Sequence, residues 1–220
     1  MKLIICDSKG WIDLASRLLK EHDVLTIRER EDLTDKLLEE IAPDYVFFAH
    51  WNWFVEENIY QTFRCIVFHT SPLPYGRGGS PIQNLILNGF KRAPVCAIKM
   101  VDELDAGPIY SKREISLEGS LEKIFSRINA AINELILEIV SRHAEPKKQK
   151  GRVHKFKRLS EKDNEIPSGI ELNQFYDRVR MLDHPSYPSA YIKYGDIKLE
   201  FSNAELSGDE LLVKCRITKC

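Results

Sequence analysis

The chain has 220 residues, of which 43% are hydrophobic and 30% are charged, and its formal net charge is −1 at pH 7. This composition is typical of a soluble globular protein with one large domain, or one large domain and a small appendage. The charge balance argues against a broad nucleic-acid surface, and no apolar run approaches the roughly 20 residues that a transmembrane helix needs. We therefore expect a cytoplasmic protein with neither a nucleic-acid nor a membrane partner.

Strand and helix patterns alternate along the first 143 residues. The N-terminal apolar run, residues 2–8, predicts a first strand rather than a signal peptide. Apolar periodicity predicts helices near residues 11–19, 33–42, 55–62 and 80–89, the last with Ser80 as its cap, and a long amphipathic helix over 120–143. Apolar runs predict strands over 23–27, 44–50, 64–69, 94–100 and 107–116. This order predicts an α/β fold, a Rossmann-like doubly wound and mostly parallel sheet, as a domain over residues 1–150.

The composition changes after Pro146. Seven basic residues lie between Lys147 and Arg158, and we interpret this run as a solvated surface. A helix is expected over residues 170–182, followed by short alternating strands with Gly-Asp turns. Residues 151–220 are therefore predicted to form a small C-terminal β-rich subdomain, which could pair with a second copy to make a homodimer.

Chemically distinctive residues follow three of the predicted strands. Residues 44–50 lead into HWNW, residues 64–69 end on His69 before a Pro/Gly-rich loop, and residues 94–100 run into a segment that contains Asp105. Ligands bind outside the carboxyl ends of strands in open α/β sheets, so His69 and Asp105 are candidates for an acid/base pair. No serine or cysteine sits in a nucleophile elbow and no histidine pair has metal-ligand spacing, so neither covalent catalysis nor a metal site is expected. The five cysteines (Cys6, Cys65, Cys96, Cys215 and Cys220) include no CxxC pair.

Two separated motifs carry a family resemblance. HTSPLPYGRGGSPIQ, from His69, followed by LDAGPIY resembles the folate-dependent formyltransferases, which move a formyl group from N10-formyltetrahydrofolate to an amine. The resemblance implies that His69 is the catalytic histidine and that Asp105 is its aspartate. It also implies a folate site, without a metal, that is formed by two groups of residues: Ser71, Leu73 and Pro74 in the loop, and Trp53, Phe54, Val101, Asp102 and Leu104 around the pterin.

The sequence departs from the family pattern two residues before the histidine. The family has an asparagine there that helps to hold the formyl oxygen, whereas this chain has Val67, which shares a strand face with His69. Losing one oxyanion donor typically costs about 10²–10³ in rate, so an active enzyme needs a replacement. Asn52 is a candidate, although it could equally serve only to shape a turn. Protonated His69 could itself donate to the oxyanion, or the protein could bind folate without turnover.

The resemblance also suggests an acceptor. Within the family the motifs look most like bacterial nucleotide-sugar N-formyltransferases of the pseudaminic acid type, which implies a UDP-linked 4-amino-4,6-dideoxy sugar. Arg77, Lys9, Trp11 and Tyr75 are then candidates for binding the diphosphate and the base. Methionyl-tRNA and glycinamide ribonucleotide are the alternative acceptors. The tRNA enzymes have a large basic C-terminal domain, which we do not expect the roughly seventy residues after the first predicted domain to provide.

Overall fold

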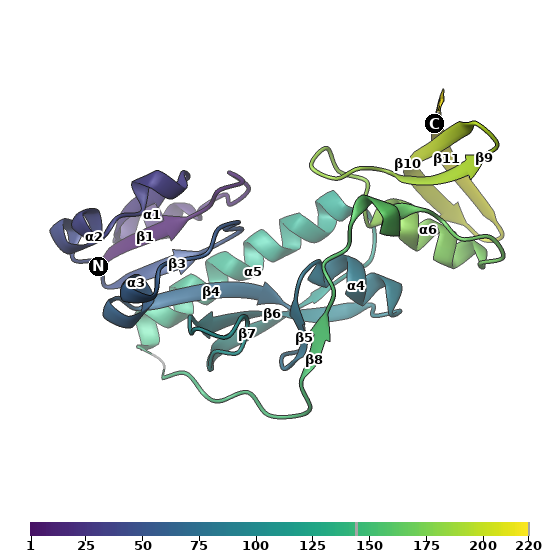
Figure 1. Ribbon diagram of the computed structural model, residues 1–220. Helices are drawn as coiled ribbons and strands as arrows, with labels where there is room; N and C mark the ends of the chain where they lie inside the picture. The colour runs from purple at the N-terminus through teal and green to yellow at the C-terminus, as the bar shows by residue number, and fades with distance from the viewer. Residues whose placement is uncertain (144, 220) are drawn as a thin grey trace.

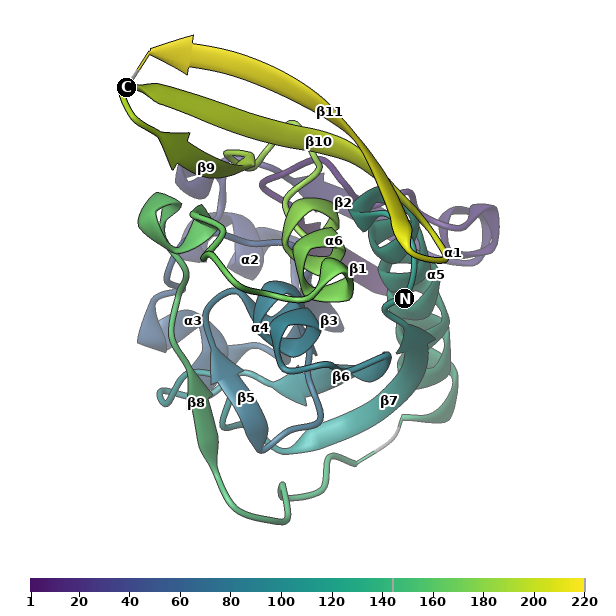
Figure 2. The same cartoon turned by 90° about the vertical axis from the view of Figure 1, so that its right-hand side faces the viewer.

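A computed structural model describes residues 1–143 and 145–219, and its centre is a six-stranded mixed sheet (Figures 1 and 2). Four strands are parallel to one another, and β6 and β7 add an antiparallel pair at one edge. In spatial order the strands are β2 (Asp23–Ile27), β1 (Lys2–Cys6), β3 (Tyr45–Phe48), β4 (Cys65–Thr70), β6 (Arg92–Lys99) and β7 (Ile109–Ser116). The predicted α/β fold with a mostly parallel sheet is confirmed.

Helices cover both faces of this sheet, because alternate strand residues point to opposite sides. In β3, Tyr45 and Phe47 belong to the core beneath α1 (Ser16–Glu21), α4 (Pro81–Leu87) and α5 (Leu121–Arg142). The intervening Val46 and Phe48 pack against α2 (Asp35–Ile41) and α3 (Glu57–Thr62). Burial on both faces explains why the central strands are continuous apolar runs.

Two local expectations differ from the structure. Residues 11–15 are not helical, because amide side chains of α5 bind their backbone: Asn129 donates to the carbonyl of Trp11 at 2.6 Å, and Asn133 accepts from Ala15 N at 2.7 Å. Ser80 occupies the cap position of α4 but makes no side-chain bond to that helix. Its hydroxyl accepts from Leu159 N at 3.1 Å and so joins α4 to the chain after β8 (His154–Phe156).

The chain after α5 forms a separate two-stranded sheet with an earlier segment before it forms the C-terminal unit. β8 pairs in parallel with β5 (Tyr75–Gly78), a short strand inside the segment that the sequence suggested was a loop. The 3-10 helix Glu161–Asn164 and α6 (Leu172–Arg180) follow, and then a three-stranded antiparallel sheet of β9 (Ala190–Tyr194), β10 (Ile197–Ser207) and β11 (Glu210–Lys219). A second 3-10 helix, Arg30–Asp32, precedes α2.

The C-terminal sheet lies on the far side of α6 from the main sheet (Figures 1 and 2). Phe175 of α6 packs against Phe201 of β10, with ring centroids 5.3 Å apart. Buried Arg180 donates to the carbonyls of Leu117 and Gly119, so α6 is bonded to the loop before α5. The proposed boundary between residues 150 and 151 stays a prediction, and β8 just beyond it pairs with a strand of the first predicted domain.

Within residues 1–143 and 145–219, no helix combines the length and the apolar character that crossing a membrane would require.

Candidate active site

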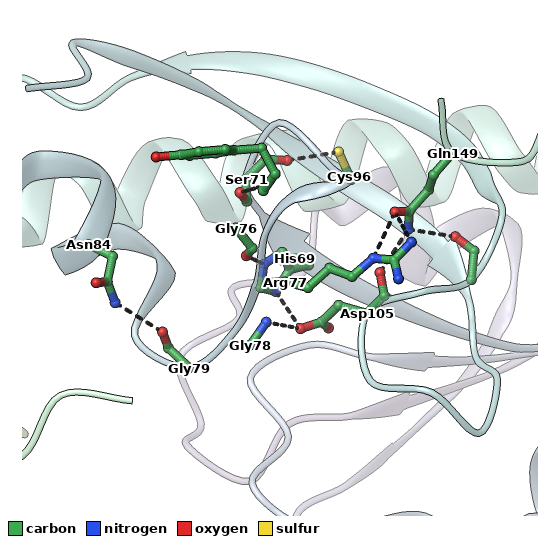
Figure 3. Close-up of polar contacts among 12 residues, drawn as sticks. His69, Ser71, Gly76, Arg77, Gly78, Gly79, Asn84, Cys96, Asp105 and Gln149 are labelled. Carbon is green, nitrogen blue, oxygen red and sulfur yellow. Dashed lines mark hydrogen bonds and ion pairs between the residues drawn. The ribbon is translucent and has the colours of Figure 1, made fainter. Parts of the chain in front are cut away.

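His69 lies one residue before the end of β4, on the same face as Val67, and its side chain is 7% exposed. Its Nε2 lies 2.7 Å from the carbonyl oxygen of Gly76, and its Nδ1 lies 3.5 Å from Oδ2 of Asp105 (Figure 3). The carbonyl can only accept, so Nε2 carries a proton. Since Nδ1 also faces an acceptor, only the protonated imidazole ring can donate on both sides.

Asp105 reaches this histidine by a route that differs from the expected one. The three strand ends are expected to meet at one end of the sheet, but β6 is antiparallel to β4 and its carboxyl end lies at the opposite end of the sheet. Met100 N therefore bonds to the carbonyl of Cys65, at the start of β4, and the chain then runs back toward the end of β4. Asp105 has a φ of +55° and accepts a hydrogen bond from Gly78 N at 2.9 Å.

Buried Arg77 and half-buried Gln149 form a hydrogen-bonded pair behind Asp105 (Figure 3). The Arg77 guanidinium donates twice to Oε1 of Gln149, at 2.8 and 3.1 Å. Nε2 of Gln149 then donates to the carbonyls of Asp105 at 2.7 Å and Gly107 at 2.9 Å. The three residues of β5 from Gly76 to Gly78 thus contact the His69 ring, Gln149 and the Asp105 carboxylate in turn.

Replacing Gln149 by Glu is expected to lower kcat by about 10–100-fold, because a misplacement of about 1 Å in a catalytic group can cost about 10²-fold in rate. Glutamate can still accept from Arg77, but it cannot donate to the carbonyls of Asp105 and Gly107. The measurement is kcat with the donor saturating. Lys148→Gln is the control, since it makes the same change in charge at an exposed neighbour. Equal kcat in the Gln149→Glu variant and the wild type would show that the Arg77–Gln149 pair does not position Asp105.

Two cavities meet at Val67. The Trp11 cavity, of ≈ 330 Å³, is lined by Trp11, His69 and Asn52 among others. The Trp53 cavity, of ≈ 280 Å³, is lined by Trp53 and Asp105 among others. Phe48, Trp51 and Val67 line both. The His69–Asp105 pair therefore lies between two spaces, each large enough for part of a small ligand.

The residues predicted to hold folate divide into two groups in the structure. Trp53, Phe54, Val101, Asp102 and Leu104 all line the Trp53 cavity. Ser71, Leu73 and Pro74 do not line either cavity; they shape the loop after β4. The Ser71 hydroxyl donates to the carbonyl of Tyr75, and Leu73 packs on the buried strand β6.

The residues predicted to hold the second substrate also separate. Lys9 and Trp11 line the Trp11 cavity, with Lys9 Nζ 5.7 Å from the Trp11 ring centroid. Arg77 and Tyr75 line neither cavity. Arg77 binds Gln149, and Tyr75 stacks on His154 with centroids 4.7 Å apart. Their roles in binding a substrate stay predictions.

Four residues near the site were given no role from the sequence. His50, Arg158 and Tyr187 line the Trp11 cavity, and Gln149 supports Asp105. The position of His50 in HWNW was a visible signal, whereas Gln149 is a single neutral residue inside a basic run. Among the described residues, no cluster of three or more histidine, cysteine or acidic side chains could hold a metal ion.

A buried histidine–aspartate pair between two cavities, on an open α/β sheet, is typical of an enzyme that moves a group between two substrates. A family model described as "Formyl transferase" matches residues 10–140, and one described as "Methionyl-tRNA formyltransferase, C-terminal domain" matches residues 161–218. The chain belongs to the formyltransferase family.

Similar proteins include the methionyl-tRNA formyltransferase of Thermotoga maritima, 28% identical over 195 residues, which are 84% of this chain and 62% of that protein. The solved methionyl-tRNA formyltransferase of Clostridium thermocellum is 35% identical, with a TM-score of 0.91 and 100% of both chains covered. A sugar N-formyltransferase from Shewanella is 17% identical, with a TM-score of 0.66 over 94% of this chain and 99% of that one, and so shares the fold. The chain spans about 62% of the length of the Thermotoga relative.

Proposed function

We propose that this protein transfers a formyl group from 10-formyltetrahydrofolate to a primary amine, with methionyl-tRNA as the acceptor. The observation that carries the transfer is the contact between His69 and Asp105 at the junction of the two cavities, inside the segment that matches the formyl transferase model. The match of residues 161–218 to a methionyl-tRNA formyltransferase domain and the similarity to the Clostridium thermocellum protein support the choice of acceptor.

The Trp53 cavity suits the donor. It is walled mainly by aromatic and aliphatic side chains, which fit a flat heteroaromatic ring such as a pteridine, and Lys99, Asp102, Glu103 and Asp105 add charged groups to its lining. Phe54 and Leu104 at this cavity are 89% and 59% exposed. Large apolar side chains that are exposed beside a cavity are typical of a site that a ligand covers. The donor is consumed in each turnover and supplies an activated formyl carbon.

His69 then has two roles. Its protonated ring, held between Gly76 and Asp105, places positive charge at the junction where the formyl oxygen becomes negative. It can also pass a proton to the leaving nitrogen when the old bond breaks, provided that one ring N–H turns from Gly76 or Asp105 toward N10. Val67 offers no hydrogen bond here, so Asn52, which lines the Trp11 cavity, stays the candidate for a second donor to that oxygen.

A nucleotide-linked amino sugar is the second candidate acceptor. The Trp11 cavity combines two cations, Lys9 and Arg158, with the aromatic rings of Trp11 and Tyr187. That combination suits a diphosphate and a base. The expectation that nucleic acid is excluded depended on the charge balance and on the absence of a large basic C-terminal domain. The match of residues 161–218 to a methionyl-tRNA formyltransferase C-terminal domain and the similarity to the Clostridium thermocellum protein now outweigh it.

The test is a turnover assay with 10-formyltetrahydrofolate and either methionyl-tRNA or a UDP-4-amino-4,6-dideoxy sugar, with products identified by mass. Formyl-methionyl-tRNA as the faster product supports the first candidate. A faster formylated sugar supports the second. Folate binding without product from either acceptor, or from glycinamide ribonucleotide, would mean that the protein binds folate without turnover.

A further inference from the structure

We propose that His50 is the base that takes the proton from the attacking amine, so that proton removal and proton donation fall to two different histidines. This inference rests on the proposed formyl transfer, and it does not depend on which amine is the acceptor. His50 lies two residues beyond the end of β3 and lines the same cavity as His69.

The backbone and one side chain fix the ring of His50. Its φ is +58°, a left-handed conformation that is uncommon outside glycine and that asparagine, aspartate and histidine adopt more often than other residues. Nε2 of His50 lies 3.2 Å from Oδ1 of Asn129 on α5. The amide nitrogen of Asn129 donates to the carbonyl of Trp11, so its oxygen is free to accept from His50.

The tautomer of the neutral His50 ring follows from this bond. Because Oδ1 of Asn129 accepts, Nε2 of His50 carries the hydrogen, and the lone pair lies on Nδ1. The described residues give Nδ1 no hydrogen-bond partner, and this atom is not among the buried polar atoms that lack one. Nδ1 is therefore not fully buried, and the residue that carries it lines the Trp11 cavity, so a ligand there can reach it.

The surroundings keep this ring uncharged near neutral pH. Burial lowers the pKa of His50 below 6.5, while the hydrogen bond to Asn129 and the charge of Asp7 oppose that shift. Lys9 and Arg158 also line the cavity. Among the described residues, the remaining titratable groups on this side are His69, Tyr187 and His184. His184 contacts Trp11, which in turn contacts His50.

His69 cannot supply the same lone pair in this arrangement. Its Nε2 donates to Gly76, and its Nδ1 faces the carboxylate of Asp105 rather than the Trp11 cavity. A neutral His50 with a free lone pair and a protonated His69 are the two partners that formyl transfer needs.

His50 and His69 together account for every proton that moves in the formyl transfer. The amine lone pair forms a bond to the formyl carbon, the C=O π electrons move to oxygen, and the amine proton goes to Nδ1 of His50. When the oxygen pair returns, the bond from the formyl carbon to N10 breaks, and N10 keeps that pair and takes a proton from His69. The products are the formamide and tetrahydrofolate, and His50 and His69 return to their starting states by exchange with water.

The first test is His50→Asn, because asparagine tolerates the left-handed backbone but is not a base at this pH. We expect kcat to fall by about 10²–10³-fold, within the range of general-base catalysis, while tetrahydrofolate binding is unchanged. His143→Asn is the matched control: His143 also has a positive φ, of +47°, but it is exposed and lines neither cavity. A His50→Asn enzyme with kcat within threefold of wild type would overturn the proposal.

The second test, the pH dependence of kcat/KM, shows whether His50 acts as a base or only supports the structure. The kcat/KM of the wild type should fall as pH drops through the His50 pKa, because the protonated ring has no lone pair. Asn129→Asp places a carboxylate against Nε2, which favours the imidazolium, so this fall should move to higher pH. A profile that Asn129→Asp leaves in place would contradict the base role.

The third test is independent of turnover. Nitrogen-15 chemical shifts of the imidazole ring, measured on wild-type protein without substrate, should show a neutral His50 with hydrogen on Nε2 at pH 7. A ring with hydrogen on Nδ1, or a charged ring, would overturn the assignment even in an active enzyme. Conversely, failure to formylate any amine, with the expected tautomer present, would count against the proposed function and not against the ring geometry.

Discussion

Replacing His69 by Ala is expected to lower kcat by about 10²–10⁴-fold, the range for a group that transfers a proton in the transition state. The substitution removes the hydrogen bond to Gly76 and the partner of Asp105, and it leaves no proton for the departing nitrogen. Single-turnover kinetics with bound donor would show the loss in the chemical step. The donor should still bind, since the lining of the Trp53 cavity does not include His69.

A companion variant tests the contribution of the carboxylate. Asp105→Asn keeps an oxygen that can accept from Gly78 N, so the loop stays in place, but it removes the negative charge beside Nδ1 of His69. We expect a smaller loss than in His69→Ala. If both variants matched the wild type, neither residue would take part in catalysis, and the assignment of the site would be wrong.

Gly78→Ala is expected to lower the free energy of unfolding by about 2–5 kcal/mol and to abolish most activity. Gly78 has a φ of +106°, and a Cβ there would lie 2.6 Å from the carbonyl oxygen of Phe156 in the paired strand. Backbone strain contributes about 1–2 kcal/mol. The overlap contributes about 1–3 kcal/mol more. Moving this residue also moves the N–H that holds Asp105.

Gly89→Ala is the matched control for that variant. Gly89 also has a positive φ, of +77°, but no atom lies within 4 Å of the position that a Cβ would occupy. The Gly89→Ala variant therefore has the backbone strain of a positive φ but no steric overlap. We expect it to lose about 1–2 kcal/mol of unfolding free energy and to keep its activity. Urea denaturation and kcat, measured on both variants, make the comparison. Equal losses of stability in the two proteins would show that β5 and β8 separate easily.

Much of the fold and the position of the central pair could be predicted from local sequence. Continuous apolar runs mark the strands that are buried on both faces, and the two motifs place His69 and Asp105 close together. The expected route of the chain to Asp105 was nevertheless wrong, because no local sequence pattern shows that β6 runs antiparallel to β4. The roles assigned to the predicted site residues stay predictions.

The support of the site could not be predicted, because it depends on partners distant in sequence. Gln149 lies 72 residues from Arg77, and Asn129 lies 79 residues from His50. Each contact uses one ordinary amide side chain, which carries no sequence signature of its own. Trp11 shows the same effect, since its helical periodicity is overridden by amide groups of α5.

The pairing of β5 with β8 links the segment around the His69–Asp105 pair to the chain beyond residue 150. In β5, the carbonyl of Gly76 accepts from His69 and the N–H of Gly78 donates to Asp105. β8 is the strand that pairs with β5. A polypeptide truncated at residue 150 would keep every residue of the His69–Asp105 pair and lose β8. It would expose the backbone N–H and C=O groups of β5 that β8 binds, and an unpaired strand of this kind can pair with other chains and aggregate. The segment from residue 151 onward thus contributes to the scaffold of the site through β8, so we do not expect it to be exchangeable between relatives as an independent unit.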